Sequence, residues 1–192
     1  EAHVTVDGQR YPTERPFMVI ATQNPIEQAG TYKLPEAQLD RFLMKTSVGY
    51  PETDAAVQVL AGSSQPDRSK RLSPVLAQQA VAEMIDSVKD NYIDQSVLLY
   101  IQRLVEATRN DNDTALGVST RGAIAMVRAA RVWAAAHGRH YVLPDDVKEL
   151  AVPVWTHRLI LSPEAEFSGV SATDVIARVL ASVEAPTSRM NA

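Results

Sequence analysis

Residues 21–42 read ATQNPIEQAGTYKLPEAQLDRF and lie between two apolar segments. The first segment, PFMVIAT at 16–22, has the length and composition of a strand that is buried on both faces. The second, FLMKTSVGY at 42–50, also predicts a strand. In open α/β sheets, ligands bind beyond the carboxyl ends of the strands. We therefore expect the loop between these segments to form part of a functional site.

Two residues of this loop are candidates for chemistry. Asn24 follows the first apolar segment, where a neutral amide can orient a water molecule or a phosphate oxygen; the alternative is that Asn24-Pro25 only starts a turn. Arg41 carries a planar guanidinium suited to bidentate phosphate binding, and Asp40 beside it is expected to hold it in place. The alternative for Arg41 is a surface ion pair of little energetic value.

Around this loop, short local patterns predict a hairpin and two helices. HVTV at 3–6 alternates apolar and polar residues before the turn signal Asp7-Gly8, which predicts a β-hairpin with a short second arm. PEAQLDR at 35–41 predicts a short helix with Pro35 in its first turn. ETDAAVQVLAG at 52–62 predicts a helix that Gly62 ends.

Beyond residue 73 the apolar residues recur at spacings of three and four, which predicts a helical bundle. The expected helices cover residues 74–88, 94–110, 119–138, 144–159 and 171–183. Asp94 is the expected N-cap of the second, whose buried stripe comprises Val97, Tyr100, Ile101, Leu104 and Val105. Ser119 or Thr120 should cap the third, which Gly138 should end, and Pro153 should kink or end the fourth.

Arg121 is the third candidate site residue. It lies in the first turn of the helix expected at 119–138, where free N–H groups and the helix dipole favour a bound anion. Arg128 lies seven residues further on the same face, and Arg131 one turn beyond it. The alternative is a solvated basic face, opposite a core side that includes Ile124, Val127 and Trp133.

Composition excludes several other classes of site. The chain has 192 residues, no Cys and a formal net charge of −4, so thiolate chemistry is absent and a nucleic-acid binder is disfavoured. Its four His residues are scattered, which argues against a metal site. The sequence contains no G-x-x-x-x-G-K-[ST] phosphate loop and no apolar run of the roughly 18 residues that a membrane helix needs.

Taken together, these segments resemble a known family. FMVIATQNPIEQAGTYKLPEAQLDRFLMKTSVGYP at 17–51 closely resembles the signature of MoxR-type AAA+ ATPases. LGVSTRGAIAMVRAARVWAAAHGRHYVLPDDVKELAVPVWTHRL at 116–159 resembles the helical lid of that family, with Thr120 in place of the usual Pro before Arg121. The resemblance implies a fold that is mainly α with a small β portion. Residues 1–61 would be the C-terminal part of an incomplete AAA+ α/β core, 62–73 a linker, and 74–192 an all-α helical-bundle lid.

The resemblance also implies roles for the three candidates. Asn24 matches sensor 1, which orients the attacking water near the γ-phosphate. Arg41 matches the arginine finger, which reaches the nucleotide of the neighbouring subunit. Arg121 matches sensor 2, a lid residue that contacts the γ-phosphate of its own subunit.

What the resemblance implies for the whole protein is a cytoplasmic ATPase that uses ATP and Mg²⁺. It would form a ring, expected to be a hexamer, and would remodel client proteins together with von Willebrand A domain proteins. The Walker A and Walker B motifs of the family would precede Glu1, so we expect this chain alone to be inactive. Exposed apolar surface, and with it self-association or partial disorder, is then expected around residues 1–50. An MCM-like DNA-binding subunit and a magnesium-chelatase-like subunit are the alternatives.

Overall fold

The computed structural model describes residues 3–23, 35–62 and 72–187, and its Cα positions divide the chain into two units. The first unit comprises Glu1–Ile20 and Thr46–Asp86, and the second comprises Ala21–Lys45 and Ser87–Ala192. The sequence-based boundaries of core, linker and lid stay predictions, because most of the expected linker lies outside the described residues.

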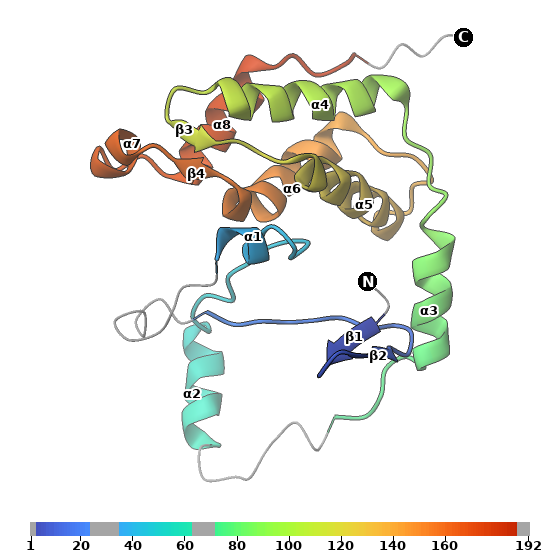
Figure 1. Ribbon diagram of the computed structural model, residues 1–192. Helices are drawn as coiled ribbons and strands as arrows, with labels where there is room; N and C mark the ends of the chain where they lie inside the picture. The colour runs from blue at the N-terminus through green and yellow to red at the C-terminus, as the bar shows by residue number, and fades with distance from the viewer. Residues whose placement is uncertain (1–2, 24–34, 63–71, 188–192) are drawn as a thin grey trace. The chain divides into compact units, whose positions relative to one another are not determined.

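The first unit begins with the predicted hairpin (Figure 1). Strand β1 (His3–Val6) pairs antiparallel with β2 (Gln9–Pro12), with Val6 opposite Gln9. The two turn residues, Asp7 and Gly8, have φ angles of 49° and 79°. A two-residue turn with positive φ at both positions matches the right-handed twist of the strands, which is why Asp-Gly predicted it correctly.

Two helices complete the first unit. Helix α2 (Thr53–Ala61) ends at Gly62 as predicted, and α3 (Gln78–Ser87) lies within the helix expected at 74–88. Arg15 ion-pairs with Asp86 of α3 at 2.8 Å, and the Gln78 side chain donates to the carbonyl of Arg15 at 2.9 Å. These two contacts hold the segment after the hairpin against both ends of α3.

The two apolar segments around the opening loop do not form strands. Residues 17–23 and 44–50 have no regular secondary structure, and side chains such as Met18 and Ile20 are 78% and 79% exposed. A strand is stable when neighbouring strands accept its hydrogen bonds and other elements cover its faces. The described residues supply neither, so the predictions of a buried strand at 16–22 and of a second strand at 42–50 are wrong for this chain.

The second unit is a helical bundle (Figure 1). Its main helices are α4 (Gln95–Asn110), α5 (Thr120–Ala136), α6 (Pro144–Trp155) and α8 (Ala172–Ser182), and their largest fully buried side chains include Trp155, Tyr100 and Met126. Short helices α1 (Glu36–Leu39), η3 (Thr156–Arg158) and α7 (Pro163–Phe167) surround them. A small antiparallel pair, β3 (Thr114–Leu116) with β4 (Ile160–Leu161), was not predicted. The predicted fold class, mainly α with a small β portion, is confirmed.

Helix α4 forms as its sequence predicts. Asp94 is the N-cap, and its carboxylate accepts from the backbone N–H of Ser96 at 2.8 Å. The whole predicted stripe is buried, together with Thr108. The Thr108 hydroxyl donates to the carbonyl of Val105 and accepts from the backbone N–H of Val118, at 2.7 and 3.0 Å. This buried hydroxyl fixes the chain just before α5.

Helix α5 has the predicted cap but a different core side. Ser119 accepts from the N–H of Gly122 at 3.2 Å, and Gly138 follows the helix with a φ of 69°. Ile124 and Trp133 are 49% and 37% exposed, so their expected place in the core is wrong. The buried residues are small ones and one Met: Gly122, Ala125, Met126, Ala129, Ala130 and Ala134. Small side chains allow a neighbouring helix to approach closely, and α6 packs along this side.

Pro144 opens α6 at its first turn, as expected. Pro153 lies inside α6, which ends two residues later at Trp155 and continues into η3. Near this end of α6, the carbonyl of Pro153 accepts from the backbone N–H of Lys45 at 2.8 Å. Within the described part of the chain, we find no helix with the length and apolar character needed to cross a membrane.

Candidate functional site

Asp40 lies at the end of α1 and is the centre of a charged cluster in the second unit. Its carboxylate accepts from Nε of Arg158 at 3.0 Å, from Oγ of Ser119 at 3.2 Å and from Nη1 of Arg121 at 3.3 Å. These partners, which were not predicted, come from the start of α5 and from η3. The next residue, Arg41, has an exposed side chain. The Asp40 carboxylate therefore connects the end of the opening loop to the helical bundle.

Arg158 is the buried cation of this cluster, with a side chain only 2% exposed. Besides its bond to Asp40, its Nη2 donates to the carbonyls of Phe42 at 2.5 Å and Asp40 at 3.2 Å. Its Nη1 donates to the carbonyls of Leu43 at 3.1 Å and Val154. Burial lowers the pKa of the Arg158 guanidinium, and the Asp40 carboxylate opposes this effect. The guanidinium thereby binds one carboxylate oxygen and four carbonyl oxygens.

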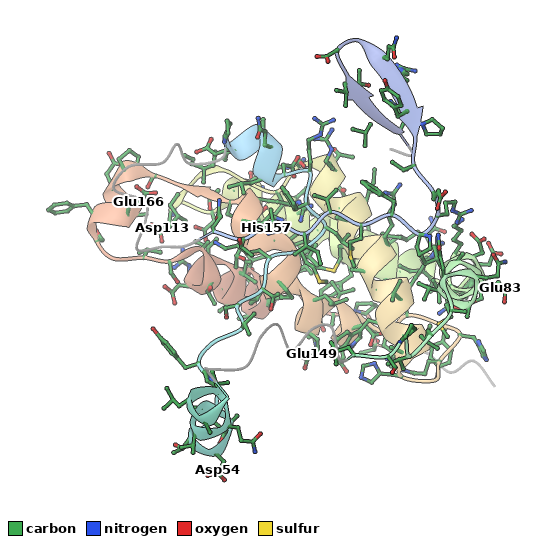
Figure 2. All side chains as sticks on the ribbon, turned by 90° about the horizontal axis from the view of Figure 1, so that it is seen from below. Asp54, Glu83, Asp113, Glu149, His157 and Glu166 are labelled. Atoms are coloured by element: carbon green, nitrogen blue, oxygen red, sulfur yellow. The ribbon has the colours of Figure 1, made fainter. Side chains whose placement is uncertain are left out.

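His157, which Figure 2 labels, adds a further contact to the same segment. Its Nε2 lies 3.2 Å from the carbonyl oxygen of Phe42. A carbonyl oxygen only accepts, so Nε2 carries the proton. Burial lowers the pKa of His157, and the positive charges of Arg158 and Lys45 lower it further. The neutral Nε2–H tautomer is therefore the form that this site favours near pH 7.

Gly122 has no Cβ, and this leaves room for the side chain of Arg158 beside it. A Cβ at position 122 would lie 2.5 Å from Cγ1 of Val118 and 2.9 Å from Cδ of Arg158. The carbonyl of Gly122 also accepts from Nε1 of the buried Trp155 at 3.1 Å. The first turn of α5 and the end of α6 are therefore in direct contact at the base of the cluster.

Arg121 lies beside this contact, in the first turn of α5 as predicted. Its side chain is 61% exposed, while that of Asp40 is 20% exposed. An exposed guanidinium beside free helix N–H groups is suited to an anionic group such as a phosphate. Its contact with the Asp40 carboxylate is long and open to solvent, so an incoming phosphate would compete with Asp40 for Arg121 at low cost.

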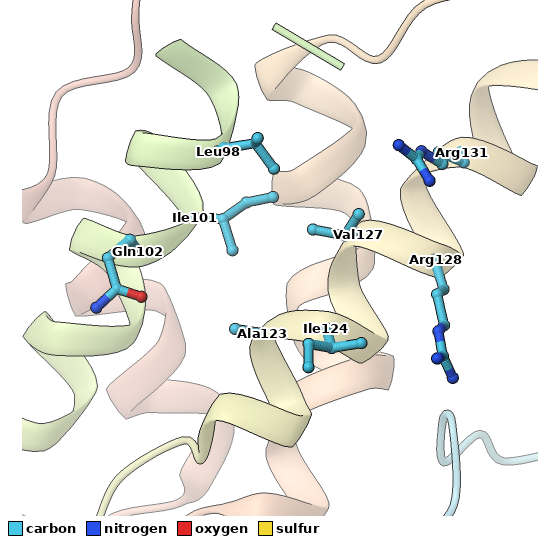
Figure 3. A pocket seen from close by; sticks show the side chains of 8 residues that line it. All are labelled: Leu98, Ile101, Gln102, Ala123, Ile124, Val127, Arg128 and Arg131. Atoms are coloured by element: carbon cyan, nitrogen blue, oxygen red, sulfur yellow. The ribbon is translucent and has the colours of Figure 1, made fainter. Parts of the chain in front are cut away.

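Arg128 and Arg131 line a different surface, a groove of about 350 Å³ between α4 and α5 (Figure 3). The other lining residues are Leu98, Ile101, Gln102, Ala123, Ile124 and Val127. Arg128 follows Arg121 by seven residues, which places their Cα atoms roughly 10 Å apart along the helix. The three arginines of α5 therefore do not converge on the Asp40 cluster.

The structure leaves the prediction for Asn24 untested, and a metal site was not expected from the sequence. Asn24 lies outside the described residues, so its place relative to the cluster is not known. Within residues 3–23, 35–62 and 72–187, no group of three or more His, Asp or Glu residues is arranged to hold a metal ion.

Arg158 was missed because no local pattern marks it. It lies 118 residues from Asp40 along the chain, and only the fold brings the two together. The sequence contained one weak signal, a His157-Arg158 pair two residues after Trp155, which ends a Pro-containing helix. Such a position lies beside the core, where a charged residue needs a partner.

Two family comparisons match the two parts of the chain. Residues 1–44 match the family described as "ATPase family associated with various cellular activities (AAA)", and residues 106–179 match the "AAA lid domain". The Asp40 cluster joins residues from both matched regions. The class is thus defined: the chain is part of an AAA+ module, a core segment followed by a helical lid.

Similar proteins specify the family. The chain is 41% identical to YeaC of Bacillus subtilis over 98% of its length, and 39% identical to the chaperone MoxR1 of Mycobacterium tuberculosis over 97%. It is 32% identical over 78% of its length to the protein MoxR of Paracoccus denitrificans. A solved structure of a candidate ATPase from Cytophaga hutchinsonii covers 97% of the chain with a TM-score of 0.86 and 36% identity. The chain belongs to the MoxR family of AAA+ ATPases.

The chain spans 59%, 51% and 50% of these three relatives and 59% of the solved chain. These matches do not favour the MCM-like or the magnesium-chelatase-like alternative. The matches name the family, while the roles of Asn24, Arg41 and Arg121 stay predictions.

Proposed function

We propose that the protein containing this chain hydrolyses ATP in a ring and uses the energy to remodel or activate client proteins. The observation that carries this proposal is the contact of Arg121 with Asp40. It brings the exposed cation at the first turn of the lid helix within 3.3 Å of the residue that precedes Arg41. Both arginines are exposed, so Arg121 can reach a nucleotide of its own subunit and Arg41 can reach that of a neighbour.

Each candidate residue has a distinct role in this proposal. Asn24 is sensor 1 and orients the attacking water. Arg41 is the finger that stabilises transition-state charge on the nucleotide of a neighbouring subunit. Arg121 is sensor 2 and binds the γ-phosphate of its own subunit, exchanging Asp40 for the phosphate.

ATP and Mg²⁺ complete the proposed site, and the residues of this chain fit only part of it. Bound ATP with Mg²⁺ supplies the γ-phosphate that water attacks. Arg121 and the α5 N-terminus offer donors for phosphate oxygens, while the chain has no phosphate-loop motif. We therefore propose that this chain by itself is inactive and that other parts of the protein bind the nucleotide. Partners in this proposal are further copies in a hexamer, von Willebrand A domain proteins and clients in the cytoplasm.

The proposal is tested by ATP turnover of the full-length protein. Arg121→Ala should lower kcat by about 100-fold, because one charge-stabilising donor is lost. Arg128→Ala is the matched control, since it removes an exposed arginine two turns along the same helix. Equal effects of the two substitutions would contradict the sensor role of Arg121.

The other two candidates are tested in the same assay. Arg41→Ala and Asn24→Ala should each lower the rate of ATP turnover by at least about 100-fold while ATP binding persists. Turnover that survives Arg41→Ala would refute the finger role. Phosphate release by this chain alone, at the rate of the full-length protein, would refute the proposal that it is inactive by itself.

A further inference from the structure

The segment Asp40–Lys45 is held to the end of the lid helix α6 and to η3 by hydrogen bonds that its own backbone groups make. Arg158 donates to the carbonyls of residues 40, 42 and 43, and His157 donates to that of residue 42. The N–H of Lys45 donates in turn to the carbonyl of Pro153. These bonds fix the main chain on both sides of Arg41, whatever the conformation of its own side chain.

Arginine suits this task for geometric reasons. Its guanidinium presents five N–H groups in a rigid plane, and all three nitrogens of Arg158 are used here. Lysine has three donors at a single point and cannot span a carboxylate and carbonyls of several residues. The donors of Arg158 go to Asp40, Phe42 and Leu43, apart from one bond to Val154 of α6. The side chain therefore recognises the shape of this one segment.

The same end of α6 also holds the start of α5. Trp155 donates to the carbonyl of Gly122, the residue next to Arg121, and the Arg158 side chain packs against Gly122. Asp40 connects the two arginines, because its carboxylate binds both Arg158 and Arg121. The backbones that carry Arg41 and Arg121 are thus fastened to one group of residues.

We propose that Arg158 is a positioning residue that fixes Arg41 to the lid of its own subunit, so that both arginines move together. This inference rests on the proposed function, in which Arg41 acts on the nucleotide of a neighbour. The γ-phosphate that draws Arg121 then shifts the lid of one subunit, and Arg158 transmits that shift to the finger in the next site. One subunit's nucleotide state is thereby communicated to its neighbour through a single buried guanidinium.

A buried charge is a costly way to obtain stability alone. An apolar residue of similar size often stabilises a buried site as well as an ion pair does. Arg158→Met replaces the guanidinium by a flexible apolar side chain, and Arg158→Lys keeps the charge but loses the planar fork. Arg178→Met is the control, since Arg178 is a half-exposed lid arginine that pairs with Asp111 and Asp113.

The first test measures ATP turnover in the full-length protein. Arg158→Met should lower kcat by roughly 100-fold with little change in KM, because misplacing a catalytic group by about 1 Å has this effect. Arg158→Lys should recover only part of the loss, and Arg178→Met should keep the normal kcat. A normal kcat in folded Arg158→Met, with the thermal transition retained, would overturn the inference.

The second test mixes subunits. Arg158→Met subunits keep an intact site of their own, whereas Asn24→Ala subunits keep an intact finger. Turnover should reappear in the mixture, because some Arg158→Met sites then adjoin a normal finger. Mixing Arg41→Ala with Asn24→Ala is the reference for a finger that acts between subunits. If the reference recovers and the Arg158→Met mixture does not, Arg158 acts on its own site and the inference is wrong.

The reference mixture also separates the two proposals. Its failure to recover would refute the intersubunit finger itself, independently of Arg158. A third measurement needs no activity: amide hydrogen exchange of residues 40–45 should speed up in Arg158→Met and stay unchanged in Arg178→Met. Unchanged exchange in Arg158→Met would show that the segment is held by other contacts and would overturn the inference.

Discussion

Replacing Asp40 by Asn should destabilise the second unit far more than the same change at an exposed ion pair. Asp40 faces a guanidinium whose side chain is 2% exposed, at 3.0 Å. Asn keeps the size and one acceptor oxygen of Asp but removes the negative charge. Arg158 is then a buried cation whose partners are chiefly carbonyl oxygens.

The magnitude follows from burial. Removing one partner of a fully buried ion pair costs about 3–5 kcal/mol. Asp40 is 20% exposed and Asn retains an acceptor, so we expect a loss below this range, about 2–3 kcal/mol. Arg121 adds less than about 1 kcal/mol, because its guanidinium is mostly in solvent.

The control is Asp113→Asn. Asp113 lies 2.6 Å from Arg178, closer than Asp40 lies to Arg158, but its side chain and that of Arg178 are 34% and 48% exposed. The expected loss is about 0–1 kcal/mol. If the distance between the charges decided the loss of stability, Asp113→Asn would show the larger loss. Because burial decides it, we expect the larger loss for Asp40→Asn.

Urea unfolding followed by far-UV circular dichroism measures both changes. With a slope of about 2 kcal/mol per M, the Asp40→Asn midpoint should fall by roughly 1–1.5 M and the control midpoint by less than about 0.5 M. Equal midpoints for Asp40→Asn and the unsubstituted chain would refute the reasoning. They would mean that carbonyl oxygens alone compensate the buried guanidinium.

Three further predictions concern the same unit. Gly122→Ala should lower the free energy of unfolding by about 1–3 kcal/mol in urea, because the new Cβ would lie 2.9 Å from Cδ of Arg158. This clash outweighs the gain of about 1 kcal/mol in helix propensity. Because the pKa of His157 is lowered by burial, stability should fall as the pH drops below about 6.5, and His157→Gln should flatten this part of the profile when unfolding is measured between about pH 5 and 8. Burial raises the pKa of Asp146, but hydrogen bonds from Arg139 and a backbone N–H outweigh it and lower the pKa overall. Stability from Asp146 should therefore be lost as the pH falls below about 3.9, and Asp146→Asn should remove this acid dependence in unfolding measured from about pH 5 to 2.

Local sequence was sufficient where a few neighbouring residues decide the structure. Asp7-Gly8 predicted a tight turn because both residues tolerate positive φ, and Asp94 and Ser119 predicted caps because short polar side chains bind free N–H groups. The stripe of α4 was correct because its large apolar residues share one helix face.

Prediction failed where distant residues decide. The segment at 17–22 has the composition of a buried strand, but composition cannot supply the neighbouring strands that would make it one. The core side of α5 was wrong because helix packing there favours small residues, and Ile124 and Trp133 were chosen for hydrophobicity alone.

The sequence by itself determined the longer helices, the caps of α4 and α5, the hairpin and the membership of the MoxR family, because these depend on residues close together or on a continuous signature. It also marked Arg41 and Arg121 as candidates. Only the tertiary structure decided that Asp40 binds Arg121 and Arg158, and that Arg158 holds the backbone around Arg41. The physical reason is that a buried guanidinium takes whichever acceptors the packed chain presents, and those of Asp40, Phe42 and Leu43 lie more than 110 positions away in the sequence.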